Sequence, residues 1–319
     1  MWFRGLTGFD ETDGDTVRSR LHLEGDQLTS TVNGRTIGVG TLTTPSLAEL
    51  RIQTTDTGPG TISEIFADVA DLHADPANAG AVFQVASQFN LLEMPSPSTT
   101  PERGVDGYER DRTQGPACAV ACGGGTIYRN WFHPVDGGVG QTSTRQIDCL
   151  ADLGDALGND RGQLWTMQNG YGLASSSGLL RISAILDTTT PAERDHLAGL
   201  LRIGVHTDVE VTRNDAGHRV TQIYGSALPV AYGEPQTGQW ERFARLVLDA
   251  SYEATLRAAQ CSTAASGNPT VFLTLLGGGV FGNKMQWIED AIVRAVRLLG
   301  AGLDLRLVSY GSSATAHLR

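Results

Sequence analysis

The stretch Val271-Phe272-Leu273-Thr274-Leu275-Leu276-Gly277-Gly278-Gly279-Val280-Phe281-Gly282-Asn283 decides the fold. Its apolar first half predicts a buried strand, and three consecutive glycines follow directly. Behind the loop, apolar residues recur at helical spacing from Ile288 to Leu299, which predicts an amphipathic helix. Such a strand, loop and helix start favour phosphate binding, because glycines let the backbone approach an anion and free N–H groups point at it.

The composition is that of an acidic globular protein. The chain has 319 residues, of which 40% are hydrophobic and 18% charged, and its net charge is −11. This length suits one large α/β domain or two small ones. A surface this acidic disfavours non-specific binding to a nucleic-acid backbone, but it leaves room for one anion held locally by backbone amides.

The sequence predicts neither a membrane segment nor a metal site. No apolar run reaches the roughly 18 residues that span a bilayer, and the first six residues lack the apolar core of a signal peptide. We therefore expect a cytoplasmic protein that does not bind membranes. Four cysteines do not make a disulfide framework. Cys118, Cys122, His133 and Cys149 do not follow a standard zinc spacing, which favours small buried cysteines.

Strands and helices are expected to alternate along the rest of the chain. One hairpin over 28–39 turns at Asn33-Gly34, and a second joins 203–212 to 219–224. Further strands are predicted at 81–86, 179–186 and 303–310, and helices are predicted to begin near 44 and 190 and to run over 240–255. The segment 118–130, which contains Gly123-Gly124-Gly125, shows no clear period and is not assigned. This order indicates a layered α/β architecture with some parallel pairing.

The glycine loop also matches two other nucleotide-binding patterns in part. Gly277, Gly279 and Gly282 satisfy G-x-G-x-x-G, which belongs at the start of a βαβαβ unit with an acid at the end of the next strand. Here one strand remains, and Asp304 stands at its start, which disfavours a nicotinamide-dependent oxidoreductase. No Gly-Lys-Ser/Thr follows the glycines, so a Walker A loop is excluded.

The C-terminal half resembles a macrodomain. Residues 252–259, the strand from Val271 and the loop Gly279-Val280-Phe281-Gly282 are similar to the helix, strand and loop with which that family wraps the diphosphate of ADP-ribose. Val85-Ala86-Ser87-Gln88-Phe89-Asn90 resembles the family's strand ending in Asn-Ala-Ala-Asn, and Arg103-Gly104-Val105-Asp106-Gly107 resembles the Gly-Gly-Val-Asp-Gly loop of its MacroD-type hydrolases. The resemblance implies a three-layer α/β/α macro-like domain with a mixed central sheet over 76–319, after a β-rich extension over 1–75.

Poly(ADP-ribose) glycohydrolases share this fold, but the Gln-Glu-Glu signature of those enzymes is absent from this chain. Gln114-Gly115-Pro116 stands nearby instead. The resemblance implies an ADP-ribosyl hydrolase that frees ADP-ribose from a modified protein or nucleic-acid base by cleaving the bond at the anomeric carbon of the distal ribose. The transition state of such a cleavage resembles an oxocarbenium ion, so the site needs a carboxylate or the ligand's own phosphate near the anomeric carbon, and no redox cofactor.

The same resemblance assigns roles to individual residues. Asp106 is the first candidate for the carboxylate, Glu109 and Asp111 are further acids, and Asn90 would orient the distal ribose. Ligand contacts are expected from Gln88, Phe89, Gly104, Val105, Gly107, Gln114, Gly277, Gly278, Gly279, Val280, Phe281, Gly282, Asn283 and Tyr310. The alternative is a module that binds ADP-ribose without cleaving it, which needs no acid near the anomeric carbon.

Overall fold

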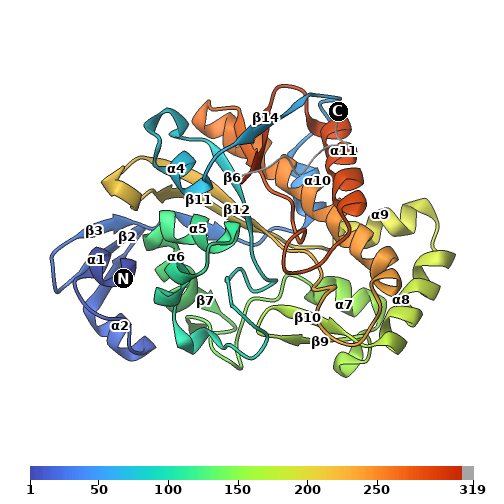
Figure 1. The fold of residues 1–319 in the computed structure, drawn as a ribbon, viewed down its shortest axis with the longest axis horizontal. Helices are drawn as coiled ribbons and strands as arrows, with labels where there is room; N and C mark the ends of the chain where they lie inside the picture. Colours follow the sequence, from blue (N-terminus) through green and yellow to red (C-terminus); the bar gives the residue numbers. More distant parts are fainter. Residues whose placement is uncertain (311–319) are drawn as a thin grey trace.

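The computed structural model describes residues 1–310, and a seven-stranded sheet forms its centre (Figure 1). The strand next to one edge, β11, is antiparallel to both of its neighbours, and the remaining pairs are parallel. The predicted mixed sheet is therefore confirmed. Its strands, in spatial order, are β4 (Thr41–Thr43), β11 (Gly204–Glu210), β12 (Arg219–Gly225), β6 (Val82–Ala86), β13 (Thr270–Leu273), β14 (Asp304–Ser309) and β5 (Ile62–Phe66).

Helices cover both faces of this sheet. Successive side chains of β12 point to opposite faces, as the period of a strand requires. Thr221 hydrogen-bonds to Ser262 in one layer, whereas Gln222 donates to the Cys118 carbonyl in the other. The first layer contains α3 (Leu47–Gln53), α8 (Ser176–Thr188), α9 (Pro191–Gly199), α10 (Glu241–Ser266) and α11 (Met285–Leu299). The second contains α4 (Val69–Ala74), α5 (Gln114–Ala121) and α6 (Gly123–Trp131), so the three-layer prediction is confirmed.

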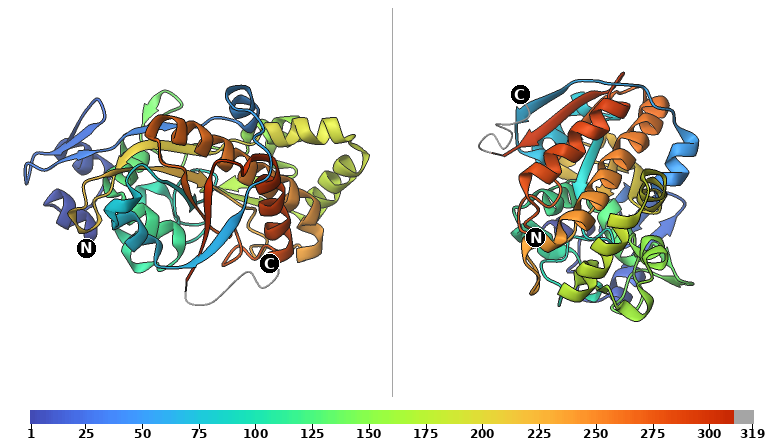
Figure 2. Two further views of the ribbon diagram at one scale, coloured as in Figure 1. Left: turned by 90° about the horizontal axis from the view of Figure 1, so that it is seen from above. Right: turned by 90° about the vertical axis from the view of Figure 1, so that its right-hand side faces the viewer.

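The apolar periodicity of the C-terminal half corresponds to packed helices. Figure 2 shows α10 and α11 side by side, and both bury apolar stripes beneath the sheet. The predicted helix behind the glycine loop is α11, with Ile288, Ala291, Ile292 and Ala295 buried. No helix among residues 1–310 is long and apolar enough to cross a bilayer.

The N-terminal region forms a small antiparallel sheet beside the main one. The hairpin predicted over 28–39 is confirmed, because β2 and β3 pair across it. Both edge strands of the main sheet, β4 and β5, also precede residue 75, so the N-terminal segment completes the central sheet. The elements outside the main sheet here are α1 (Trp2–Thr7), α2 (Gly14–Arg20), β1 (Leu21–Glu24), β2 (Gln27–Ser30) and β3 (Thr36–Gly38).

Short elements fill the segment between β6 and β11. Tyr171 donates a hydrogen bond to the Met94 carbonyl, and Asn169 donates to the Pro97 carbonyl, so the hairpin of β9 and β10 braces the long loop after β6. These elements are β7 (Pro134–Val135), β8 (Gly138–Val139), α7 (Ala151–Leu157), β9 (Trp165–Gln168) and β10 (Tyr171–Ala174). Short 3-10 helices are η1 (Pro76–Asn78), η2 (Pro101–Arg103), η3 (Asp106–Arg110), η4 (Asp160–Gly162), η5 (Arg213–Asp215) and η6 (Thr237–Trp240).

The segment 179–186 is helical, so the strand predicted there is wrong. Ser175 caps the N-terminus of α8 by accepting a hydrogen bond from the Gly178 amide. Leu179, Ile182 and Leu186 are the buried apolar residues, and their spacing of three and four is helical. The unassigned segment 118–130 falls in α5 and α6, which are separated at Cys122.

Candidate active site

A cavity of about 930 Å³ opens at the carboxyl ends of the parallel strands. Ala86 ends β6, Gly225 ends β12, Ser309 ends β14 and Thr274 follows β13, and all four line the cavity. Open α/β sheets bind their ligands in the crevice beyond the carboxyl ends of their strands. The volume also lies within the range of about 300–1,000 Å³ that small-molecule sites occupy. This cavity is therefore the candidate active site.

The glycine loop after β13 forms one wall of the cavity. Gly277, Gly279, Val280 and Phe281 line it, and the diphosphate contact expected of them stays a prediction. Gly277 has a φ of 72°, and a Cβ there would lie 2.5 Å from the Ala227 Cβ, so only glycine fits without strain. Among residues 1–310, the Gly279 and Val280 amides donate no hydrogen bond and remain available to a ligand.

The other three loop residues shape the wall from behind. Asn283 is buried and donates from Nδ2 to the Leu228 carbonyl at 2.8 Å, which ties the loop to the segment after β12. Gly278 packs on Ile288 of α11, and the Gly282 amide bonds back to Gly279. None of these three lines the cavity, so they stabilise the loop from behind its wall.

An aromatic cluster continues this wall. The rings of Tyr171, Tyr232 and Phe281 lie within 5.2–5.6 Å of one another, and all three residues line the cavity. Tyr310 also lines it and is 83% exposed, which places this residue at the rim. Aromatic faces of this kind suit the flat rings of a nucleoside.

The loop predicted to form the opposite phosphate wall binds a carboxylate of the chain itself. Glu11 Oε2 accepts the Val105 amide at 2.7 Å and the Asp106 amide at 2.6 Å, and Glu11 Oε1 accepts Trp131 Nε1. Gly104 has a φ of 80°, and a Cβ there would lie 2.4 Å from the Glu11 carboxyl carbon. Gly104, Val105 and Gly107 do not line the cavity, because this loop faces the N-terminal segment.

The residues after β6 divide between the cavity and the core. Gln88 lines the cavity, and its Oε1 accepts the Met94 amide at 2.6 Å. Phe89 and Asn90 are buried and do not line it. Asn90 donates to Gln146 Oε1 at 2.8 Å and accepts the Leu92 amide at 3.1 Å, so its side chain stabilises the turn after the strand. The structure does not bring Asn90 to this cavity.

The three predicted acids are also divided. Asp106 is half-buried outside the cavity, and burial, with Glu109 nearby, raises its pKa. Glu109 lines the cavity, but its Oε2 accepts the Trp2 amide at 2.8 Å. Asp111 lines it as well and accepts the Thr113 amide and hydroxyl. Two of the three acids therefore reach the cavity wall, and both are engaged in local hydrogen bonds.

Sequence analysis missed a fourth acid, Glu93. It lines the cavity and is only 4% exposed. Its carboxyl lies 3.3 Å from Nη2 of Arg129, which is fully buried. Burial raises the pKa of Glu93 to about 7, although the Arg129 charge works in the opposite direction. A carboxyl that exchanges its proton near neutral pH is suited to general acid–base catalysis.

A signal for Glu93 is present in the sequence. It follows Leu91 and Leu92 and precedes Met94, just after a buried strand, and an acid in such an apolar run is seldom solvated. Its partner Arg129 lies in the segment 118–130, which shows no clear period in the sequence. Without that helix, the sequence alone did not indicate what would pair with the acid.

The start of α5 forms another part of the cavity wall. Thr113 to Ala117 line it, but the Gln114 side chain is engaged: Oε1 accepts the Ala86 amide and Nε2 donates to the Gln84 carbonyl. Gln114 therefore clamps β6 to α5. Two cations, Arg112 and Arg213, also line the cavity, and Arg213 is paired with Asp71.

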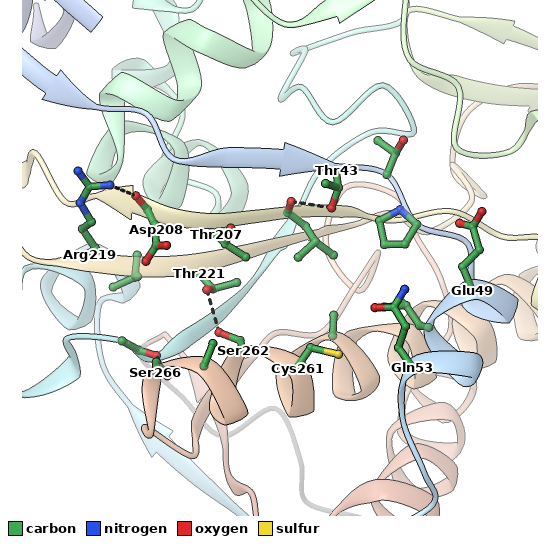
Figure 3. Close-up of a pocket in the computed structure, with 18 residues that line it drawn as sticks. Thr43, Glu49, Gln53, Thr207, Asp208, Arg219, Thr221, Cys261, Ser262 and Ser266 are labelled. Atoms are coloured by element: carbon green, nitrogen blue, oxygen red, sulfur yellow. Dashed lines mark hydrogen bonds between the residues drawn. The ribbon is translucent and has the colours of Figure 1, made fainter. Parts of the chain in front are cut away.

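A second cavity of about 620 Å³ lies between α10 and the β4–β11–β12 edge (Figure 3). Small and hydroxyl-bearing side chains line much of it, and Thr221 and Ser262 hydrogen-bond to each other there. Its Arg219 is paired with Asp26, and its Glu49 with Arg202. The first cavity differs in holding the glycine loop and a buried carboxyl.

Three of the cysteines belong to the hydrophobic core. Cys118, Cys122 and Cys149 are free and buried, and burial raises the pKa of each thiol. Within the described part of the chain, no group of three or more His, Cys, Asp or Glu side chains could hold a metal ion.

No protein-family model and no curated protein matches the sequence. Similar solved structures are poly(ADP-ribose) glycohydrolases. The enzyme from Thermomonospora curvata is 14% identical over 96% of this chain and 94% of that chain, with a TM-score of 0.44. Its complex with the inhibitor ADP-HPD is 15% identical over 93% of this chain and 91% of that chain, with a TM-score of 0.45. The Deinococcus radiodurans enzyme in complex with ADP-ribose is 12% identical over 84% of this chain and 86% of that chain, with a TM-score of 0.40. These likenesses are distant.

Proposed function

We propose that this protein is an ADP-ribosyl hydrolase that cleaves the bond at the anomeric carbon of the distal ribose. The observation that carries the proposal is the buried Glu93 carboxyl, with a pKa near neutrality, in the cavity that also holds the glycine loop. The loop amides of Gly279 and Val280 would bind the diphosphate, and the Tyr171, Tyr232 and Phe281 rings would pack on the nucleoside.

Glu93 would supply the proton that the leaving group needs. Near pH 7 a substantial fraction of this carboxyl is protonated, so it can protonate the glycosidic oxygen as the carbon–oxygen bond breaks. Water then adds to the anomeric carbon, and its proton restores the Glu93 carboxyl. The step uses substrate and water alone. Asp111 and Glu109, on the same cavity lining, would balance the positive charge that develops on the ribose ring.

The acceptor that carries the ADP-ribose is a modified protein or nucleic-acid base. Tyr310 at the exposed rim is available to contact such an acceptor. The alternative proposal, a module that binds ADP-ribose without cleaving it, uses the same loop and rings but leaves Glu93 without a chemical role.

The test compares two carboxyl variants for release of ADP-ribose. The substrates are proteins ADP-ribosylated on Glu, Arg or Ser and ADP-ribosylated DNA, and release is measured by chromatography. Glu93→Gln should lower kcat by about 10²–10⁴-fold, because a general acid contributes that much. The same variant should bind ADP-ribose within about threefold of the native protein, because the amide keeps the shape of the side chain.

Asp106→Asn is the matched control, since Asp106 lies outside the cavity. We expect its kcat to stay within about threefold of the native value, because a side chain outside the cavity makes no contact with the reacting atoms. Loss of turnover in Asp106→Asn with normal turnover in Glu93→Gln would return the acid role to Asp106. No release from any substrate by the native protein, together with ADP-ribose binding, would favour the binding module.

A further inference from the structure

A buried chain of polar side chains runs from Glu93 away from the cavity. Arg129 donates from Nη1 to the Tyr224 hydroxyl, and Tyr224 in turn donates to Gln222 Oε1. Gln222 Nε2 lies 3.1 Å from Nε2 of His73, and His73 Nδ1 lies 2.7 Å from the Val69 carbonyl. Val69 lines the cavity, so the chain begins and ends at its wall.

From Arg129 to Val69 the hydrogen bonds in this chain all run in one direction, whereas Arg129 donates back to Glu93 at the other end. A neutral His73 that donates from Nδ1 to Val69 leaves Nε2 free to accept from Gln222. Burial lowers the pKa of His73 to about 4, which keeps it neutral above that pH. From Arg129 onward each member is thus a donor to the next, and the Tyr224 hydroxyl is left with a lone pair for Arg129.

This arrangement fixes the guanidinium of Arg129 on several sides. Nε donates to the Leu91 carbonyl at 3.0 Å, and the guanidinium carbon lies 3.9 Å from the centre of the Tyr224 ring. The remaining Nη2 faces the two Glu93 oxygens at 3.3 and 3.4 Å. Arg129 therefore has one charged partner and several neutral ones that determine its position.

The glycine triplet at the start of α6 explains how Arg129 reaches this place. A Cβ on Gly124 would lie 2.5 Å from Ile37, and a Cβ on Gly125 would lie 2.6 Å from Val209. Side chains at these positions would push α6 away from β3 and β11. Close packing of α6 on these strands therefore sets the depth of Arg129 in the core.

We propose that Arg129, held by Tyr224, Gln222 and the Leu91 carbonyl, is a positioning residue that fixes the Glu93 carboxyl at the cavity wall and controls when it holds a proton. The catalytic part of this inference rests on the proposed function. The part that concerns protonation does not, because it depends on the Arg129–Glu93 contact alone.

The groups that face Glu93 come from four elements. Arg129 on α6 is the charged one and favours the ionised carboxyl. Tyr108 on η3 accepts the Glu93 amide hydrogen at 3.0 Å, and its side-chain hydrogen bond to the Glu93 carboxyl lowers the pKa of Glu93, by less than the Arg129 charge does. Cys118 on α5 and Tyr224 on β12 interact electrostatically with Glu93, but burial raises the pKa of both far above neutrality, so they stay uncharged. A change in Arg129 is therefore the change to which Glu93 protonation should respond most.

The test is a direct titration of Glu93 without substrate. The chain is labelled with ¹³C at glutamate carboxyls, and the Glu93 signal is the one absent from Glu93→Gln. Arg129→Gln removes the charge and should move the midpoint up by at least about one pH unit. Arg129→Lys keeps a charge without the planar fork, so its midpoint should lie between those of the native protein and Arg129→Gln. Arg129→Lys also keeps the test valid if Arg129→Gln does not fold.

Arg257→Lys is the matched control. Arg257 and Glu253 form a similarly buried pair, with Arg257 Nε 3.0 Å from Glu253 Oε1, outside the cavity. Its substitution should leave the Glu93 midpoint unchanged. Native midpoints in both Arg129 variants would overturn the inference.

The pH profile of kcat/KM separates this inference from the proposed function. If protonated Glu93 is the acid, the basic limb should move to higher pH in Arg129→Gln by the same amount as the titration midpoint. A shifted midpoint with no hydrolysis by any form would reject the proposed function and keep the role of Arg129. Hydrolysis with an unmoved limb despite a shifted midpoint would reject Glu93 as the acid.

Discussion

Two buried groups of this protein should make opposite contributions to its pH-dependent stability. Glu93 has its pKa raised from 4.5 to about 7, so its contribution is full below pH 4.5 and is lost as pH rises through 7. His73 has its pKa lowered from 6.5 to about 4, so its contribution is full above pH 6.5 and is lost as pH falls through 4. Each effect amounts to about 3 kcal/mol, and the two nearly cancel between pH 4 and 7.

Single substitutions should expose each contribution. In Glu93→Gln, the free energy of unfolding should rise from pH 4.5 to 6.5 more steeply than in the native protein, because His73 acts unopposed. In His73→Gln, it should fall over the same range. Urea unfolding at several pH values measures both slopes, and equal slopes in all three proteins would contradict the assigned pKa directions.

Gly277 should tolerate no side chain, unlike its neighbour Gly279. Gly277→Ala places a Cβ 2.5 Å from Ala227 at a φ of 72°, so we expect a loss of about 1–3 kcal/mol in the free energy of unfolding. Gly279→Ala meets nothing within 4 Å and should unfold like the native protein. Equal stabilities in a denaturant titration would show that the loop is not held as described.

At the residue scale, a sequence is most informative where backbone conformation determines residue choice. The glycine loop lies at the cavity because it follows the carboxyl end of β13, and the positive φ of Gly277 selects glycine there. The sequence is less informative for Asn90 and Gln114, whose side-chain amides hydrogen-bond within the protein. Polar side chains at strand ends satisfy the backbone as readily as a ligand, and only the three-dimensional partners distinguish the two.

At the element scale, the N-terminal segment should stabilise the loop after β6. Glu11 accepts two loop amides and the Trp131 indole, so Glu11→Ala should lower the free energy of unfolding by about 2–4 kcal/mol. Hydrogen exchange at the Val105 and Asp106 amides should accelerate, as mass spectrometry would detect. Glu24→Ala, at an exposed position, is the control. Unchanged exchange in Glu11→Ala would mean that another contact holds the loop.

Helix ends and hairpin turns were the predictable elements. Ser46 and Thr190 both form capping boxes with the glutamate three residues later, and both helices begin there. The error at α8 arose because an apolar run of eight residues suits a strand as well as a helix. The α5–α6 segment was not predictable from periodicity, because close packing there selects glycine and alanine and weakens the apolar pattern.

At the scale of the whole molecule, the sheet needs the first 75 residues. A fragment of residues 76–319 lacks β4 and β5, which form both edges. It also lacks Arg51, whose Nε lies 2.7 Å from the buried Glu253. We expect this fragment to aggregate or remain partly unfolded, because two inner strands become exposed edges and a buried charge loses a partner. A monomeric fragment with native near-UV circular dichroism would contradict this and support a separable domain at residue 76.

The layered architecture followed from the order of strands and helices, whereas the sheet's edges did not. Local patterns indicate which elements form, and a right-handed crossover rule limits their order. The strands β4 and β5 form the two opposite edges because they pair with β11 and β14. A single sequence carries little signal for such long-range pairing. The same is true of the cavity, whose walls come from segments far apart in the chain.

The most direct test of the central claim is ADP-ribose binding by titration calorimetry to two glycine variants. A Cβ meets nothing within 4 Å at Gly279, in the cavity, or at Gly107, outside it, so both should accept aspartate. Gly279→Asp sets a carboxylate against the diphosphate and should weaken ADP-ribose binding at least tenfold, roughly 1.4 kcal/mol. Gly107→Asp should bind ADP-ribose like the native protein. The native protein itself should prefer ADP-ribose to AMP and NAD. Equal binding by all three proteins, or no binding by the native one, would contradict the claim that this cavity is an ADP-ribose site.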